Sequence, residues 1–222
     1  MKARTYSTFT FGDLKTQLGL TIDETGDFSA FVAEVELSAL LQDMLQETLL
    51  LALSISTEKA RSEMIITPIL IEVRRLLRHS ISLFSGTEFN VDRKQHLVGV
   101  CDFIISLSPE QLTVNAPIVM IVEAKNENLR AGIAQCAAEM VAAGMFHQQR
   151  GTQLETIYGV VTTGSTWKFL SLDSQTVHVD LKEYYIEDVA QIVSILVNMV
   201  QHAQATCLRA SPSRPPKDPS TS

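Results

Sequence analysis

One apolar run constrains the fold of this 222-residue chain more than any other feature. Residues 117–122 read Pro-Ile-Val-Met-Ile-Val, the composition of a buried strand, and Glu123-Ala124-Lys125 follows directly. Because side chains alternate along a strand, Glu123 and Lys125 emerge on the same face. Charges at the end of such a run are costly unless they are paired or bind a ligand. The run therefore predicts a buried strand that delivers a carboxylate and an ammonium to one edge of a sheet.

A second apolar stretch, residues 98–105, carries a single acid, Asp102. If the two strands pair, two carboxylates and a lysine converge, which is how a divalent metal and a phosphate would be held. The acid-x-Lys pattern alone is weak evidence for a site, since it also occurs at 13–15, 92–94 and 180–182, without the preceding apolar run. A structural ion pair between Glu123 and Lys125 is the alternative interpretation.

The bulk composition is that of one globular domain. Apolar residues make up 45% and charged residues 19%, and the apolar runs are shorter than a membrane span requires. Three cysteines without metal-ligand spacing favour reduced thiols and a cytoplasmic location. The net charge of −7 argues against coating nucleic acid through bulk charge, but it allows local contacts with a few phosphates.

The spacing of apolar residues predicts the order of helices and strands. A turn or helix is expected over 11–18, and helices are expected over 37–56, 57–78 with a break or kink near Pro68, 130–149 and 186–206. Strands are expected over 6–10, 81–90, 96–107, from 117, and over 156–163, 167–172 and 176–179. This order predicts an α/β domain with a mixed sheet between helices.

Five motifs in this order resemble the PD-(D/E)XK nuclease superfamily. They are Glu72 on an early helix, Asp102 in Gly-x-x-Asp, Glu123-Ala124-Lys125, Gln135 on the following helix, and a hairpin over 162–169. The chain is also similar to the N-terminal nuclease-type domains of type I restriction subunits and their stand-alone relatives. The resemblance implies a restriction-endonuclease-like mixed sheet flanked by helices. The expected divisions are a strand and helical flank over 1–56, a nuclease-like core over 57–208 and a disordered tail over 209–222.

The resemblance also implies a metal-dependent reaction, the hydrolysis of a phosphodiester bond in DNA. Asp102, Glu123 and the Ala124 backbone carbonyl would bind Mg²⁺, or Mn²⁺, and Glu72 would complete the shell directly or through water. Lys125 would stand by the attacking water or the scissile phosphate. An ordinary solvated glutamate is the alternative interpretation of Glu72.

The remaining site residues are implied by the same resemblance. Gln135 would orient the site or the substrate, and Arg75 and Lys168 would contact the substrate. Glu139 stands where exonuclease branches of the superfamily carry a tyrosine, so the resemblance favours an endonuclease. Such a site cuts one strand, so a homodimer is expected, with no membrane as a partner. A non-catalytic binding or assembly module of the same fold stays open as the second hypothesis.

Overall fold

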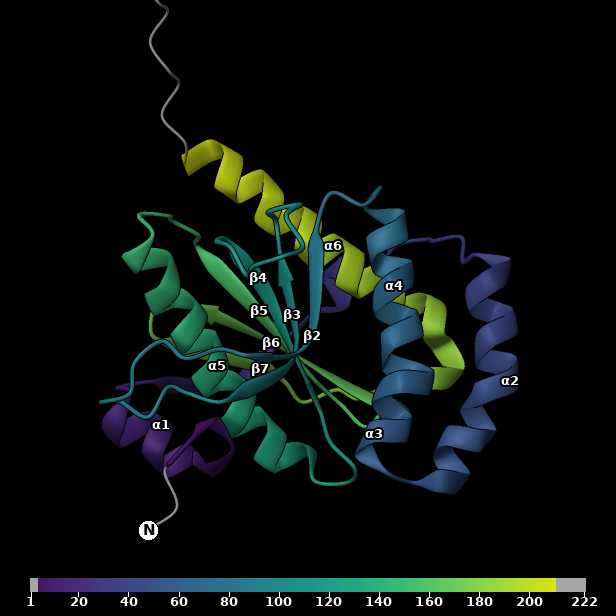
Figure 1. The fold of residues 1–222 in the computed structure, drawn as a ribbon, viewed down its shortest axis with the longest axis horizontal. Helices are drawn as coiled ribbons and strands as arrows, with labels where there is room; N and C mark the ends of the chain where they lie inside the picture. The colour runs from purple at the N-terminus through teal and green to yellow at the C-terminus, as the bar shows by residue number, and fades with distance from the viewer. Residues whose placement is uncertain (1–3, 211–222) are drawn as a thin grey trace, which may run out of the picture.

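A mixed eight-stranded sheet forms the middle layer of the protein (Figure 1). The structure is a computed structural model that describes residues 4–210. The strand order is β1-β7-β6-β5-β4-β3-β2, and β8 pairs with β6. The strands are β1 (Thr21–Gly26), β2 (Ser82–Glu88), β3 (Val100–Ser106), β4 (Ile118–Ala124), β5 (Thr156–Thr162), β6 (Thr166–Asp173), β7 (Thr176–Asp180) and β8 (Tyr184–Tyr185). This architecture confirms the predicted α/β class with a mixed sheet between helices.

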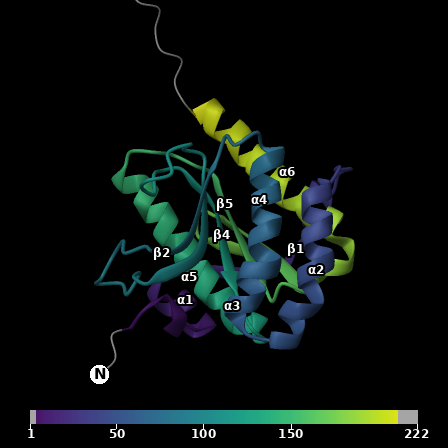
Figure 2. The same cartoon turned by 45° about the vertical axis from the view of Figure 1, so that its right-hand side comes forward.

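Helices cover both faces of the sheet (Figures 1 and 2). One face packs on α1 (Phe11–Gln17) and α5 (Leu129–Gln149), and the other packs on α4 (Thr67–Leu76) and α6 (Val189–Ala210). The outermost helix is α2 (Ala39–Ile55), which runs beside α4. The remaining helical pieces are short, namely η1 (Tyr6–Thr8), η2 (Ser29–Phe31), α3 (Glu58–Arg61), η3 (Ser62–Ile66) and η4 (Ile186–Asp188).

The strand β4 is central, as its apolar composition predicts. All seven of its residues are buried, and it pairs antiparallel with β3 and parallel with β5. After Ala124 the chain turns into α5, and the Asn128 side chain caps this helix by accepting a hydrogen bond from the Ala131 N–H. Residues 124–129 therefore bring the end of β4 and the start of α5 to the same edge of the sheet.

The predicted break near Pro68 is replaced by a π-helical turn, η3. The backbone stays helical from Glu58 to Leu76, because the Thr67 N–H bonds to the Ser62 carbonyl, five residues earlier. Proline has no N–H, so it leaves the carbonyl four residues before it, that of Met64, without a helical donor. The Thr48 hydroxyl of α2 donates to that carbonyl at 2.7 Å. The carbonyl that Pro68 leaves free thus accepts a hydrogen bond from α2, and the helix over 58–76 continues through the proline.

The N-terminal segment differs most from the prediction. Residues 6–8 form a 3-10 turn in place of the expected strand, because the Tyr6 side chain is buried and donates to the Phe89 carbonyl at 2.7 Å. A strand that was not expected, β1, pairs parallel with β7 at the edge of the sheet. Residues 21–26 therefore contribute an edge strand to the same sheet as the rest of the described chain.

The C-terminal prediction is tested only in part. The helix α6 extends to Ala210, two residues into the segment predicted to be disordered. Residues 211–222, which hold the rest of that predicted tail, lie outside the described residues. Within residues 4–210, no helix has the length and apolar character needed to span a membrane.

Candidate functional site

The register between β3 and β4 places two carboxylates side by side. Phe103 pairs with Val122, so the same register carries Asp102 to the position opposite Glu123. The Asp102 Oδ2 atom accepts a hydrogen bond from the backbone N–H of Ala124 at 2.8 Å. A side chain therefore replaces the ladder bond at the end of this strand pair, and the predicted convergence of Asp102 and Glu123 is confirmed.

Lys125 lies directly beyond β4 and joins the same cluster. Its ammonium donates to Glu123 Oε1 and, at 3.1 Å, to Gln135 Oε1 on α5. Its backbone N–H is fixed by the Thr162 carbonyl at 2.8 Å. The structure thus brings together four of the predicted site residues: Asp102, Glu123, Lys125 and Gln135.

Gly132 allows α5 to lie close enough for these contacts. A Cβ atom at this position would come within 2.9 Å of the Lys125 Cγ atom and within 2.5 Å of a Val161 methyl group. Real Cβ atoms do not approach other carbons this closely, so a side chain here would push the helix away from β4 and β5. No motif in the sequence marks Gly132 as a site residue.

Burial and mutual repulsion dominate the electrostatics of the two carboxylates. Burial, reinforced by the charge of Asp102, raises the pKa of Glu123 to about 8. Burial also raises the pKa of Asp102, although the hydrogen bond from the Ala124 N–H opposes it. Burial pulls the pKa of Lys125 down, but the adjacent Glu123 charge outweighs this effect and the net change is upward. Lys125 is therefore a cation at neutral pH.

A third buried carboxylate, Glu139, stands behind Gln135 on the same helix. Its Oε1 atom accepts a hydrogen bond from Gln135 Nε2 at 3.1 Å, and the side chain has no exposed surface. A chain of hydrogen bonds therefore runs from Glu123 through Lys125 and Gln135 to Glu139. The spacing of four residues between Gln135 and Glu139 is the sequence signal for this contact.

Glu72 and Arg75 do not reach the cluster. Both Glu72 carboxylate oxygens are occupied: Oε1 accepts from the Ser38 N–H and from Arg75, and Oε2 accepts from the Ser38 hydroxyl and from Arg75, all at 2.7–2.9 Å. The paired Arg75 guanidinium lowers the pKa of Glu72 to about 2. The pair ties α4 to the start of α2, so Glu72 is neither a metal ligand nor a solvated surface residue here, and Arg75 is its structural partner.

Glu58 is the helix-borne carboxylate that lies near the cluster. It sits in the first turn of α3, where it lines a groove of about 260 Å³ together with Asp102 and with Glu63, which is paired with Lys59. Its negative charge contributes to the raised pKa values of Glu123 and Lys125. The sequence offered one signal for Glu58, its place in the first turn of the helix predicted over 57–78, but that signal marks a helix start and does not indicate a site.

Lys168 occupies a neighbouring groove on the same face of the sheet. The register places Glu123 opposite Val161 and Val161 opposite Lys168, so one strand separates the two charged residues. The Lys168 ammonium donates to the Leu181 carbonyl at 2.8 Å and lies 3.7 Å from Glu183. The groove, of about 590 Å³, also contains Arg130 on its wall. Lys168 therefore lies near the cluster but is already paired.

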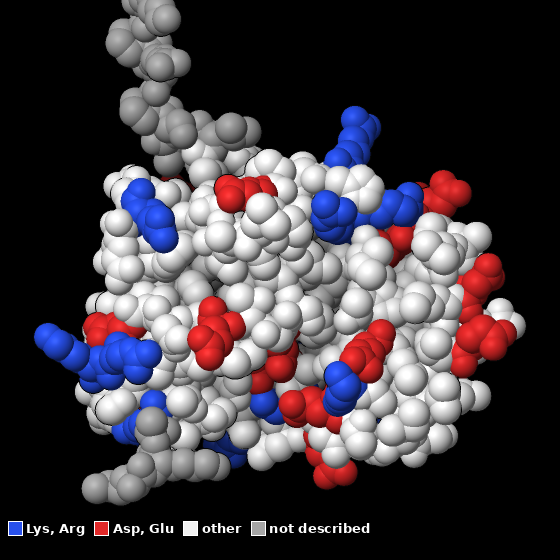
Figure 3. All heavy atoms as spheres, viewed as in Figure 1, with Lys and Arg blue, Asp and Glu red and all other residues white. Residues whose placement is uncertain are grey.

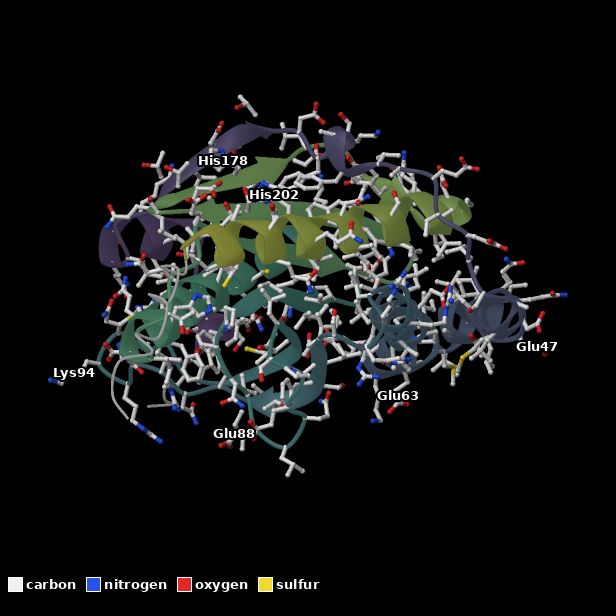
Figure 4. All side chains as sticks on the ribbon, turned by 90° about the horizontal axis from the view of Figure 1, so that it is seen from above. Glu47, Glu63, Glu88, Lys94, His178 and His202 are labelled. Atoms are coloured by element: carbon white, nitrogen blue, oxygen red, sulfur yellow. The ribbon has the colours of Figure 1, made fainter. Side chains whose placement is uncertain are left out.

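Histidines take no part in the cluster. Figure 4 shows His178 and His202 on the side of the molecule opposite Glu63. His178 contacts Asp23 at 2.8 Å, and His202 contacts the Tyr158 hydroxyl at 2.8 Å. The site is therefore built from carboxylates, one lysine and one amide.

The donor set fits a hard divalent cation that keeps most of its water. Within residues 4–210, no three His, Cys, Asp or Glu side chains are grouped closely enough to hold a metal by themselves. Mg²⁺, however, is commonly bound through one or two carboxylates, waters and a substrate phosphate. The buried Glu123 Oε2 atom lacks a hydrogen-bond partner, and its pKa is raised beside Asp102. A cation between the two carboxylates would relieve both conditions.

Comparisons of the chain with protein-family models, with curated proteins and with solved structures found no match. The assignment to a class of protein therefore depends on the order of the motifs and on the geometry of the cluster.

Proposed function

We propose that this protein is a metal-dependent nuclease of the PD-(D/E)XK type that hydrolyses phosphodiester bonds in DNA. The observation that carries the proposal is the placement of Asp102 opposite Glu123, with the Lys125 ammonium on Glu123. Two carboxylates and a cation at the end of two central strands form a compact site for a divalent cation and a phosphate. A purely structural ion pair accounts for Glu123 and Lys125 but gives no reason for Asp102 opposite them.

In this proposal Asp102 and Glu123 hold Mg²⁺ or Mn²⁺, with the Ala124 backbone carbonyl as a further oxygen ligand. Glu58 replaces Glu72 as the helix-borne carboxylate, acting through water from the adjoining groove. When bound, the cation would supply charge stabilisation to the scissile phosphate and lower the pKa of the attacking water.

The chemical role of Lys125 follows from its charge. Because the net pKa change of this residue is upward, it is protonated at neutral pH and is no general base. Its ammonium can donate a hydrogen bond to a phosphate oxygen and offset the negative charge that develops during attack. Gln135 holds the same ammonium from the other side at 3.1 Å, which limits the directions in which Lys125 can point.

The surface charge favours a second candidate function, a binding or assembly module of the same fold. Figure 3 shows acidic and basic side chains interspersed over one face, without a continuous basic band along which a duplex could lie. The net charge of −7 points in the same direction. Retention of Asp102, Glu123 and Lys125 together favours the enzyme, because a binding module has no need of all three.

Cleavage assays separate the two functions. Purified protein is incubated with supercoiled plasmid and with labelled oligonucleotides, in Mg²⁺, in Mn²⁺ and in EDTA. The nuclease proposal expects metal-dependent nicking by the wild type and its loss, by at least about a hundredfold, in Asp102→Ala and Lys125→Ala. The matched control is Glu47→Gln, which removes a carboxylate from the outer surface of α2 (Figure 4) and should cut at the wild-type rate.

Equal nicking by the wild type and by both site variants would identify a contaminating nuclease and reject the proposal. DNA binding without cleavage by a folded wild type, in either metal, would instead support the module. Plasmid linearisation at high protein concentration, with nicking alone at low concentration, would support the homodimer, because each site cuts one strand. A cytoplasmic location also belongs to this proposal and fits the three unpaired thiols, Cys101, Cys136 and Cys207.

A further inference from the structure

The buried Glu139 carboxyl group has no part in the reaction outlined above. One of its oxygens, Oε1, accepts from Gln135, while the other, Oε2, is buried without a hydrogen-bond partner. Burial and the nearby charges of Glu123 and Asp102 raise the pKa of Glu139 well above its ordinary range, and Lys125 opposes this shift. A buried polar oxygen without a partner costs free energy of folding.

The contacts of Gln135 show what this carboxyl group can do. An ammonium only donates hydrogen bonds, so Gln135 must turn its carbonyl oxygen, Oε1, toward Lys125. Its Nε2 group then points away from Lys125 and needs an acceptor. Glu139 Oε1 is that acceptor, at 3.1 Å.

The opposite orientation of the amide is disfavoured by Lys125, and the Glu139 acceptor adds to this preference. If the amide were reversed, the Gln135 Nε2 donor would face the Lys125 ammonium, and two donors would meet. The Gln135 oxygen would at the same time face a carboxyl oxygen of Glu139. Without an acceptor at position 139, both orientations would leave the Nε2 group poorly satisfied, and the preference would weaken.

We propose that Glu139 is a positioning residue that anchors the Gln135 amide by accepting from its Nε2 group and thereby holds the Lys125 ammonium against Glu123. The contacts that carry this proposal are present without metal or DNA. Only its consequence for cleavage rests on the proposed nuclease function.

Two substitutions at position 139 separate an acceptor from a space-filling group. Glu139→Gln is isosteric and keeps an oxygen that accepts from Gln135, so it should behave as the wild type. Glu139→Met fills a similar volume without an acceptor. Glu139→Leu is the replacement variant if Glu139→Met does not give a cooperative thermal transition by circular dichroism.

The direct readout is the mobility of the Lys125 ammonium in metal-free protein. Nitrogen-15 relaxation of the lysine ammonium groups is measured by NMR, with Lys125 assigned through Lys125→Arg. A restricted ammonium is expected in the wild type and in Glu139→Gln, and a mobile, rapidly exchanging one in Glu139→Met. Gln135→Met should give the same mobile ammonium, and the double variant should add nothing, because both act on one chain of contacts.

An equally restricted Lys125 ammonium in Glu139→Met and in the wild type would overturn the proposal. So would a mobile ammonium in Glu139→Gln, because that variant keeps the acceptor.

Cleavage gives an independent second readout. With KM unchanged, kcat should fall on the order of tenfold in Glu139→Met, as expected for about one lost contact to a charged group, and it should recover in Glu139→Gln. Equal kcat values in all three proteins would contradict the catalytic consequence. If the wild type does not cut DNA, the nuclease function fails, and the NMR comparison still decides the positioning role.

Discussion

Asp102 and Glu123 stand opposite each other on neighbouring strands, and the backbone N–H of Ala124 binds Asp102 at 2.8 Å. Directly opposed like charges destabilise a strand pair, so this arrangement opposes folding unless a proton or a cation lies between the two groups.

Asp102→Asn should stabilise the metal-free protein. The amide keeps an oxygen for the Ala124 N–H and removes one of the two opposed charges, so the free energy of unfolding at pH 8 should rise by about 1 kcal/mol. Urea unfolding in EDTA measures the change. Added Mg²⁺ should stabilise the wild type and leave the variant unchanged. Lower stability of the variant in EDTA would show that the two charges do not repel one another.

Metal affinity should increase with pH. Because the pKa of Glu123 is about 8, a cation must displace a proton at neutral pH. The Mg²⁺ affinity should rise by up to about tenfold per pH unit below pH 8 and level off above it. Isothermal titration in two buffers of different ionisation enthalpy measures both the affinity and the protons released. A pH-independent affinity between pH 6.5 and 8.5 would contradict the raised pKa.

Glu58 and Glu63 should differ in their effect on the metal. Both side chains line the groove that contains Asp102, but the charge of Glu58 acts on Glu123 and Lys125, whereas Glu63 is paired with Lys59 at 2.7 Å. Glu58→Gln should weaken Mg²⁺ binding about threefold to tenfold, because one nearby negative charge is lost. Glu63→Gln serves as the matched control and should bind as the wild type. An equal loss in both variants would indicate only a general effect of surface charge.

The pair of Glu72 and Arg75 should contribute stability that acid removes. The native pKa of Glu72 is about 2, below its ordinary value of 4.5, so the unfolded chain takes up the proton first as pH falls. The contribution is fully present above about pH 4.5 and is lost as pH falls toward 2. Glu72→Gln should lower the unfolding free energy at pH 7 by about 2 kcal/mol, with a much smaller difference at pH 2.5. An equal difference in unfolding free energy between the wild type and Glu72→Gln at pH 7 and at pH 2.5 would contradict this prediction. Cleavage by the variant should be unaffected at a temperature where both proteins are folded.

Protonation of His147 should cause a second loss of folding stability at acid pH. It is buried, its Nε2 atom accepts from the Ile118 N–H at 2.8 Å, and burial lowers its pKa to about 4. Since the unfolded histidine binds its proton near pH 6.5, the stability is complete above that value and falls as pH drops to 4. The loss amounts to up to about 3 kcal/mol. Glutamine keeps an acceptor for the Ile118 N–H but does not titrate. The unfolding free energy of His147→Gln, measured with urea, should therefore not show this loss between pH 6.5 and pH 4.

The central part of the site was predictable from local rules. Alternation along a strand places Glu123 and Lys125 on one face, and the acid within the preceding apolar stretch predicts Asp102 beside them. These inferences need only the period of a strand and the pairing of two consecutive strands. Gln135 needed the family resemblance as well, since nothing in the composition of α5 marks one of its polar residues.

Helix-borne residues were harder to place, because helical periodicity does not reveal which layer a helix covers. Glu72 lies beside the apolar stripe of α4 in the sequence, yet its partner Ser38 comes from the segment before α2. The distance along the chain between these two residues leaves no local signal for the contact. The helical position of Glu58 was predictable, but its place near the cluster was not, because an exposed acid in a first helical turn is common and seldom part of a site.

The strand β1 was missed for a related reason. Its residues, Thr-Ile-Asp-Glu-Thr-Gly, contain one large apolar side chain, and most are exposed or half-buried at the edge of the sheet. Its partner, β7, lies some 150 residues further along, where Thr21 pairs with Thr176. An edge strand of this kind is specified by its partner more than by its own composition.

The register of β3 against β4 also bears on when the protein can act. A slip of one residue would turn Asp102 to the other side of the sheet and leave Glu123 without its neighbour. The position of Lys125 also depends on α5, which can pack against this side chain only because Gly132 has no Cβ atom. A chain that is still folding, or folded incorrectly, therefore lacks the assembled cluster. For the proposed nuclease, activity that begins only with the finished fold would protect the DNA of the cell while the protein is being synthesised.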